Sequence, residues 1–210
     1  MNERAEKILD ILKDEFPTAG CELNYDSDYH LLIAVILSAQ CTDKRVNIVT
    51  EELFKHYSTP QDFASAKQED IEKLIYSCGF YKNKAKNIIN ASREIVEVHG
   101  GQVPKEFDKL VALSGVGRKT ANVVTSVAFG GDGIAVDTHV FRVSNRLSLA
   151  KGKTPFEVEK GLTEVIPPSR RSEAHHLLIF HGRYRCKSLS PLCDGCKLIN
   201  YCSYDKKEKK

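Results

Sequence analysis

A four-residue break, Ser-Gly-Val-Gly at 114–117, separates two apolar segments with helical periodicity, 107–113 and 119–129. Gly115 and Gly117 allow positive φ and leave backbone N–H groups uncovered by side chains, so an anion such as phosphate can approach the main chain. The pattern predicts a helix-hairpin-helix that can bind phosphate. A plain interhelical turn without a ligand fits the same residues.

Two ionisable residues near this break are candidates for chemistry. Lys119 follows Arg118 at the start of the second helix, where the positive end of the helix dipole disfavours an ammonium group. Asp137 lies eighteen residues further on, directly before the helical segment Thr-His-Val-Phe-Arg. Its structural role would be to cap that helix through its side-chain oxygen.

The rest of the chain predicts an all-α protein with roughly ten helices. The segment 29–40 is mostly apolar and predicts a buried central helix, and Glu173–Phe180 is the last helix expected. Ile134–Val136 is the one candidate strand, and it follows Gly130–Gly133, the most linker-like tract.

Composition is that of an ordinary globular protein, with 28% charged and 41% hydrophobic residues. The first sixteen residues do not resemble a secretory signal, and the longest apolar run, Tyr29–Ala39, is too short to cross a bilayer. We therefore expect a cytoplasmic protein with no membrane partner.

Charge is unevenly distributed, because the first 28 residues are acidic while basic residues concentrate further along the chain. The basic clusters are 142–153, 170–171, 183–187 and Lys206–Lys210. Such clusters fit a surface that steers a polyanion, and they equally fit a solvated face.

The seven cysteines divide into three single residues and one cluster. Cys21, Cys41 and Cys78 lie in or beside apolar patterns and are expected to be small buried hydrophobic residues.

The clustered cysteines, Cys186, Cys193, Cys196 and Cys202, have the spacing C-x6-C-x2-C-x5-C. Disulfides are rare in the cytoplasm, so four clustered thiols indicate a metal. The spacing leaves zinc, an iron–sulfur cluster and free thiols open. Basic residues flank the loop, which would display positive charge to phosphates.

Several motifs in order resemble the endonuclease III family, the bifunctional DNA glycosylases of the helix-hairpin-helix superfamily. They are LLIAVILSAQCTD, GFYKNKAKNI, GQVP, LSGVGRKTANVV, AVDTHVFRVSNR and HGRYRC with its cysteine tail. The resemblance covers nearly the whole chain. It implies two helical lobes, a barrel domain at 22–132 and an iron–sulfur domain formed by 1–21 plus 133–210.

The resemblance also implies an activity, the base-excision repair of oxidised pyrimidines by a monomeric enzyme. Lys119 matches the catalytic lysine, which attacks the sugar C1′, forms a Schiff base and cleaves the strand by β-elimination. Asp137 matches the catalytic aspartate. Bringing a lysine pKa from about 10.4 to roughly 7–8 takes about 4 kcal/mol, and burial of Lys119 is expected to supply most of it.

The implied partner is double-stranded DNA with damaged bases or abasic sites, in a bacterial cytoplasm and at the nucleoid when bound. The four clustered cysteines match the ligands of a [4Fe-4S] cluster. The residues expected to contact DNA are Gln40, Phe80, Gly115, Gly117, Arg118, His139 and Lys187.

Two positions depart from the family pattern. Ser114 stands where proline is usual, so the hairpin loses a rigid ring and regains a backbone donor, and Phe80 replaces a wedge that is often leucine. Two alternatives are a metal-stapled helix-hairpin-helix module that binds DNA without catalysis, and a mismatch adenine glycosylase. Lys119 argues against the second, because those enzymes generally lack the lysine.

Overall fold

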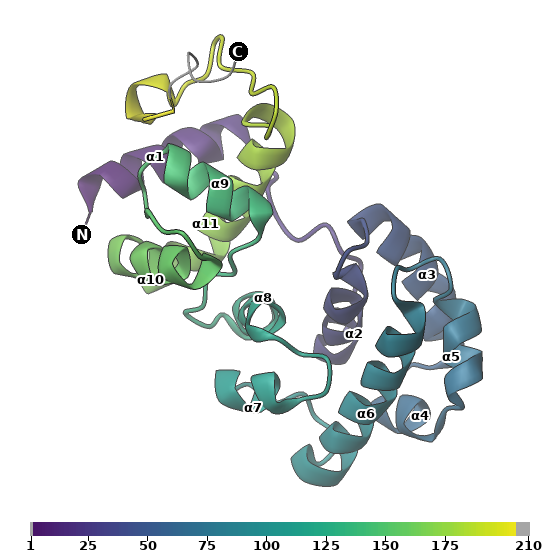
Figure 1. Ribbon diagram of the computed structural model, residues 1–210. Helices are drawn as coiled ribbons and strands as arrows, with labels where there is room; N and C mark the ends of the chain where they lie inside the picture. The colour runs from purple at the N-terminus through teal and green to yellow at the C-terminus, as the bar shows by residue number, and fades with distance from the viewer. Residues whose placement is uncertain (1, 205–210) are drawn as a thin grey trace. The chain divides into compact units, whose positions relative to one another are not determined.

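The structure, a computed structural model, describes residues 2–204, and within them it contains eleven α-helices and no strand (Figure 1). The predicted all-α class is confirmed. Ile134–Val136, the candidate strand, is buried but has no regular secondary structure. No helix in this part of the chain is long and apolar enough to cross a membrane.

The chain forms two compact units, which we describe separately. The hairpin unit is Glu22–Phe129, and the cysteine unit combines the described residues up to Cys21 with those from Gly130 onward. The helices of the hairpin unit are α2 (Asp28–Ser38), α3 (Asp43–His56), α4 (Pro60–Ser65), α5 (Gln68–Leu74), α6 (Tyr81–His99), α7 (Phe107–Ala112) and α8 (Arg118–Phe129).

Helix α2 is the buried centre of the hairpin unit and packs against α3, α6 and α8. Every residue from Tyr29 to Leu37 is buried, which explains its uninterrupted apolar sequence. The Ser27 side chain caps its first turn by accepting a hydrogen bond from the His30 N–H at 3.1 Å. The helix ends at Ser38, two residues earlier than predicted, because Ala39 leaves the helical conformation with ψ 114° and Gln40 follows with φ 54°.

Helix α6 has nineteen residues, and left-handed residues flank it at both ends. Phe80 precedes it with φ 57°, and Gly100 ends it with φ 62°, a conformation that glycine adopts without steric cost. Its apolar face packs on α4 and α5, with Ile88 and Ile95 fully buried. The helix therefore connects the loop at Phe80 with the region around the hairpin.

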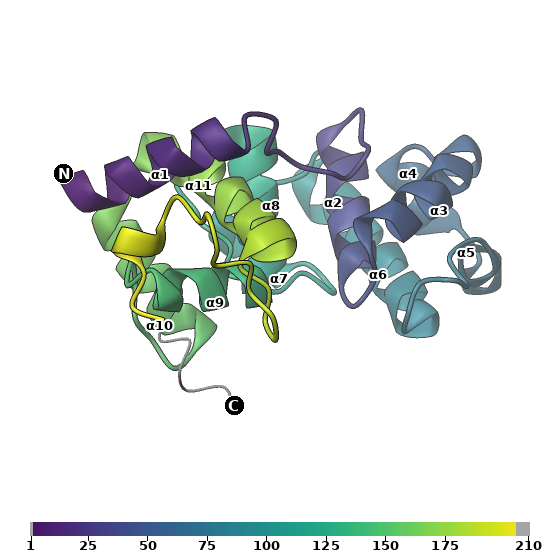
Figure 2. The ribbon, with the colours of Figure 1, turned by 90° about the horizontal axis from the view of Figure 1, so that it is seen from above.

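The cysteine unit contains α1 (Glu3–Glu15), α9 (Thr138–Arg146), α10 (Pro155–Val165) and α11 (Pro168–Phe180), followed by a π-helical turn (His181–Arg185) and a 3₁₀ turn (Ile199–Tyr201). Figure 2 shows α1 and α11, from opposite ends of the sequence, lying side by side. Ile8, Leu9 and Leu12 of α1 are fully buried in the core of this unit. Arg4 donates hydrogen bonds to the carbonyls of Leu147 and Tyr201 at 2.8 and 2.7 Å.

Helix α11 begins five residues before the predicted start at Glu173. Pro168 at its first position fits a helix start, where the missing N–H has no partner in any case. Arg170 then pairs with Glu173 and Asp10, so a polar run that the sequence left outside the helix is stabilised by contacts within this unit.

Candidate active site and cysteine loop

The hairpin between α7 and α8 is held from outside by α6. The Glu94 carboxylate accepts the Ser114 N–H at 2.8 Å and the Ser114 hydroxyl at 2.7 Å. Gly115 has φ 77°, and a Cβ at this position would lie 2.7 Å from the Asn87 Cβ. The turn therefore requires glycine here both for its backbone conformation and for its contact with α6.

Gly117 differs from Gly115 in both respects. Its φ is not positive, so of the two glycines only Gly115 uses the freedom that glycine allows. Beyond its neighbours in the chain, no atom of residues 2–204 lies within 4 Å of where its Cβ would be. Its carbonyl accepts the Ala121 N–H at 3.0 Å and so begins the hydrogen bonding of α8. The fold itself does not require a glycine at 117.

The two basic residues that follow are exposed in the first turn of α8. The Arg118 guanidinium lies 5.0 Å from the centre of the Phe107 ring, a cation–π contact across the hairpin. Lys119 is exposed, so the expected burial of its side chain is wrong for the protein by itself. The physical reason is its place on the solvent side of the first helical turn, opposite buried Ala121 and Val124.

Gln40 and Phe80 lie in two loops of the hairpin unit that pack against each other. Both residues have left-handed backbone conformations, which are uncommon outside glycine. Gln40 is exposed, and 63% of the Phe80 surface is accessible. A Cβ at Gly79 would lie 3.4 Å from the Gln40 carbonyl oxygen, so the two backbones are in contact.

In the cysteine unit, Asp137 is the N-cap of α9. Its Oδ1 accepts the N–H groups of His139 and Val140, both at 2.8 Å. The predicted capping role is confirmed, and the second carboxylate oxygen takes no part in it. His139 is partly buried, with its Nδ1 3.2 Å from Nη2 of Arg142.

The four clustered cysteines line one largely apolar pocket at the C-terminal loop. Burial raises the pKa of the Cys196 and Cys202 thiols above the usual value. Across residues 2–204, no three His, Cys, Asp or Glu side chains come close enough together to hold a single metal ion. The cysteines thus surround a common space without converging on one point.

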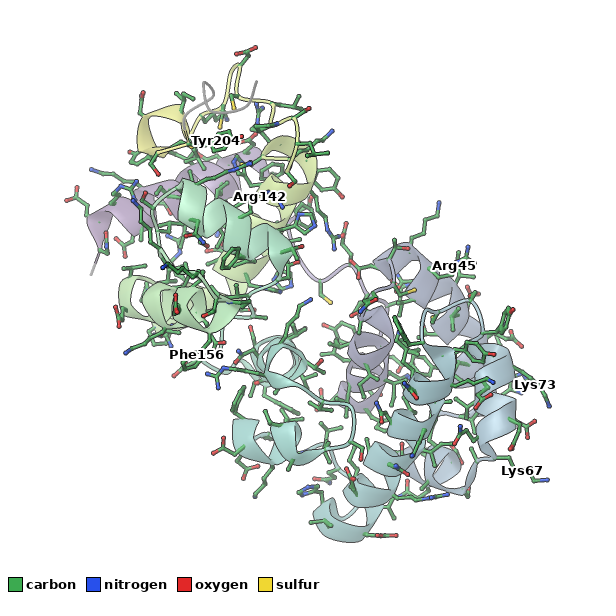
Figure 3. The ribbon with its side chains drawn as sticks, in the orientation of Figure 1. Arg45, Lys67, Lys73, Arg142, Phe156 and Tyr204 are labelled. Atoms are coloured by element: carbon green, nitrogen blue, oxygen red, sulfur yellow. The ribbon has the colours of Figure 1, made fainter. Side chains whose placement is uncertain are left out.

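Two arginines of α9 hold this loop. Arg142 donates to the carbonyls of Cys186 and Gly182 at 3.1 and 2.9 Å. Arg146 donates to the Cys186 sulfur at 3.2 Å and to the Lys187 carbonyl at 2.8 Å. Figure 3 shows Arg142 on the side of α9 that faces the C-terminal loop. These roles of Arg142 and Arg146 are not among the predictions above, although the spacing of four residues places both guanidinium groups on one face of the helix.

Several arginines of the predicted basic clusters make contacts within the cysteine unit. Arg170 pairs with acidic side chains, Arg171 donates to the carbonyls of Ile166, Thr163 and Asp132, and Arg185 pairs with Glu15. These guanidinium groups connect segments of the cysteine unit through ion pairs and hydrogen bonds. Lys187 is exposed. The predicted basic tail, Lys206–Lys210, lies outside the described residues.

The structure thus groups the predicted residues by unit. Those of the hairpin unit are Gln40, Phe80, Gly115, Gly117, Arg118 and Lys119. Those of the cysteine unit are Asp137, His139, Cys186, Lys187, Cys193, Cys196 and Cys202. Glu94, Asn87, Arg142 and Arg146 support these two groups and were not predicted.

The family of this chain follows from its similarity to known proteins. Residues 33–168 match the model of the HhH-GPD superfamily base excision DNA repair proteins. Endonuclease III of Bacillus subtilis is 50% identical over 209 residues, which cover 99% of this chain and 95% of that protein. Endonuclease III of Escherichia coli K12 is 45% identical, covering 96% and 95%.

Solved structures that resemble this chain include the same kind of protein as the relatives found by sequence. A trapped endonuclease III–DNA covalent intermediate superposes with a TM-score of 0.93 at 47% identity and covers 100% of this chain and 99% of that one. A thermostable thymine-DNA glycosylase, at 23% identity and a TM-score of 0.87, shares the fold.

The chain therefore belongs to the HhH-GPD superfamily of base excision DNA repair proteins. Within that superfamily it is similar to endonuclease III over nearly its full length, and its activity is that of a DNA glycosylase that is also an AP lyase. Neither a DNA-binding module without catalysis nor a mismatch adenine glycosylase is favoured by these relatives.

Proposed function

We propose that Lys119 is the nucleophile of this glycosylase and lyase, and that Asp137 stabilises the positive charge that develops on the sugar. The substrate is a duplex that carries an oxidised or ring-saturated pyrimidine, or an abasic site. The observation that carries the proposal is the position of Lys119, exposed in the first turn of α8 and two residues after Gly117.

The reaction begins when the neutral Lys119 amine attacks C1′ of the damaged nucleotide. The glycosidic bond breaks and the base leaves with a proton. The C1′–O4′ bond of the sugar ring then opens, O4′ takes the proton that the amine gives up, and a Schiff base joins Nζ to C1′. The imine acidifies the C2′ hydrogen, so loss of that proton expels the 3′ phosphate by β-elimination. One lysine thereby accounts for both base removal and strand cleavage.

In this proposal Lys119 reacts as the neutral amine. Its side chain is exposed in the protein alone and is therefore open to the extruded nucleotide.

The hairpin, Gln40 and Phe80 serve DNA binding. The uncovered backbone at Gly117 accepts a phosphate closely, and Arg118 adds positive charge. Extrusion of a nucleotide costs a few kcal/mol, and base stacking on an aromatic side chain returns roughly 1–3 kcal/mol. The exposed Phe80 ring and Gln40 fill the gap, while His139 and Lys187 contact the backbone from the cysteine unit.

The four clustered cysteines hold a [4Fe-4S] cluster in this proposal. They fit one because each thiolate of such a cluster binds a different iron, which suits sulfurs that share a pocket but do not converge on a single ion. When bound, the cluster supplies cross-links between four points of the loop. Arg146 donates to the Cys186 sulfur and would balance the thiolate charge.

The proposed setting is the cytoplasm of a bacterium, with the protein acting as a monomer and associating with the nucleoid through DNA. The relatives that match over nearly the full length include bacterial endonuclease III proteins.

The test of the nucleophile uses a duplex with one thymine glycol and sodium borohydride, which reduces a Schiff base to a stable amine. We expect the protein to give a covalent complex and Lys119→Gln to give none while still binding the duplex. Lys82→Gln, a change of the same kind at another exposed lysine of the hairpin unit, is the control. Equal trapping by Lys119→Gln refutes the assignment.

Two further measurements test the substrate and the cofactor. A panel of duplexes with thymine glycol, dihydrouracil, 8-oxoguanine or a mismatched adenine should show cleavage concentrated on the two pyrimidine lesions. Protein purified without oxygen should contain iron and acid-labile sulfide. Zinc without iron or sulfide contradicts the cluster.

A further inference from the structure

Cys41 and Cys78 form a thiol pair that the proposed reaction does not use. The two side chains interact electrostatically, although 37 positions separate them in the sequence. Cys78 is only 1% exposed, whereas Cys41 is partly exposed, so the expectation of burial is right for Cys78 and wrong for Cys41. Cys21 is also partly exposed. One residue of the pair is thus partly exposed and the other is buried.

The pair lies where two functional loops meet. Cys41 directly follows Gln40, and Cys78 precedes Phe80 by two residues. The backbone contact between Gly79 and the Gln40 carbonyl places these loops together independently of the sulfurs. A bond between the two sulfurs would therefore join the loops that present Gln40 and Phe80.

Lys84 supplies a cation beside both sulfurs. Its side chain is buried, with 6% of the residue surface exposed, and Nζ donates to the Leu37 carbonyl at 2.8 Å. The electrostatic interactions of Lys84 include both cysteines. A neighbouring ammonium group stabilises a thiolate, while burial raises the pKa of Cys78 to about 11. The accessible Cys41 is consequently the sulfur that meets an oxidant first.

We propose that Cys41 and Cys78 are a modification site, a thiol pair that hydrogen peroxide closes into a disulfide and that thiols reopen. Peroxide first oxidises the Cys41 thiol to a sulfenic acid and is itself reduced to one water. The Cys78 sulfur then displaces the hydroxyl group from the Cys41 sulfur and gives up its proton, which releases a second water. Two thiols and one peroxide thus yield one disulfide and two waters.

Closure brings the two sulfurs to a bond length of about 2.05 Å. The loops on either side must adjust, and each carries a residue in the left-handed conformation that is strained outside glycine, Gln40 in one and Phe80 in the other. The disulfide therefore lowers DNA cleavage. This consequence rests on the proposed DNA contacts of Gln40 and Phe80, whereas formation of the disulfide is measured without DNA.

The test treats the full chain, with its cofactor as purified, with hydrogen peroxide, blocks free thiols with N-ethylmaleimide, and analyses tryptic peptides by mass spectrometry. Residues 14–44 and 74–82 should appear as one linked peptide with the summed mass less two hydrogens. Dithiothreitol should separate it. Because 14–44 also contains Cys21, Cys21→Ser is the matched control and should retain the link.

Cys41→Ser at the accessible position and Cys78→Ser at the buried one should each abolish the linked peptide. Oxidation should reduce the cleavage rate of the unmodified chain, reversibly with dithiothreitol, and by a smaller factor in Cys41→Ser exposed to the same dose. Absence of the linked peptide while Cys41 is oxidised overturns the site. A disulfide that forms without changing cleavage overturns the coupling to the loops and leaves the proposed catalytic function standing.

Discussion

Ser114 gives both of its hydrogen-bond donors to Glu94, its N–H to Oε2 at 2.8 Å and its hydroxyl to Oε1 at 2.7 Å. This pairing explains the departure from the usual proline at the start of the hairpin. Proline fixes φ and has no N–H, whereas serine leaves a donor that must be satisfied when it is partly buried. In this chain a carboxylate on α6 satisfies it and anchors the turn.

We predict that Glu94→Ala lowers the free energy of unfolding by on the order of 1–2 kcal/mol, because two charge-assisted hydrogen bonds are lost at a partly buried site. The same change in a Ser114→Pro background should cost much less, since both donors are already gone. Urea unfolding of the four variants gives the coupling energy. Glu97→Ala, at an exposed position of the same helix, is the control, and equal losses in both backgrounds contradict the anchoring role.

The two hairpin glycines should respond differently to alanine. Gly115→Ala places a Cβ 2.7 Å from Asn87 at φ 77°, so we expect a loss of roughly 1–3 kcal/mol in the free energy of unfolding. The Cβ of Gly117→Ala meets no atom of the described residues beyond its chain neighbours, so this variant should unfold like the unmodified protein.

DNA affinity should fall for Gly117→Ala if a phosphate approaches its backbone. Thermal unfolding and fluorescence anisotropy with a labelled duplex separate the two effects. Unchanged affinity in a stable Gly117→Ala protein counts against a phosphate at this position.

Two substitutions of Asp137 separate its capping role from its proposed catalytic role. Asparagine is as good an N-cap as aspartate, whereas alanine costs about 1 kcal/mol. We therefore expect Asp137→Asn to keep the unfolding temperature and to lose cleavage of a thymine glycol duplex. Asp137→Ala should lower the unfolding temperature and also lose cleavage. If Asp137→Asn cleaves at the unmodified rate, Asp137 acts only as the N-cap of α9.

His176 should make stability depend on pH in the acidic range. Burial lowers its pKa, and its Nδ1 is 2.9 Å from the Ser172 carbonyl oxygen. Below the unfolded pKa of about 6.5 the unfolded chain binds a proton that the folded chain excludes, so the stability contributed by neutral His176 falls as the pH decreases.

His176→Gln removes this titration. The difference in the free energy of unfolding between the protein and His176→Gln should therefore shift against the unmodified protein between pH 7 and pH 5.5. Urea unfolding at the two pH values measures it, and a difference that does not change with pH shows that His176 is not desolvated.

The helical class, the caps and the hairpin follow from local patterns. Apolar periodicity, Thr and Asp before helices, Pro60 at a helix start and Gly100 at a helix end each act within one or two turns, so they can be read from the chain. Recognition of the family motifs selected Lys119, Asp137 and the four clustered cysteines as candidates, and their roles remain predictions.

Other expectations failed because they depended on the surroundings of a side chain. Burial of Lys119 was expected from its chemistry, but the helix start leaves it exposed. The arginines of the basic clusters look like a surface for a polyanion, yet several of them satisfy carbonyls and carboxylates within the cysteine unit.

The all-α class, the position of the Ser-Gly-Val-Gly turn and the family of the chain can be predicted from the sequence, since each depends on residue types at short or ordered spacing. Three relationships are visible only in the folded protein: Glu94 holds Ser114, Arg142 and Arg146 hold the cysteine loop, and Cys41 lies beside Cys78. These contacts join residues 20 to 44 positions apart, and packing between separate helices, which local patterns do not encode, brings them together.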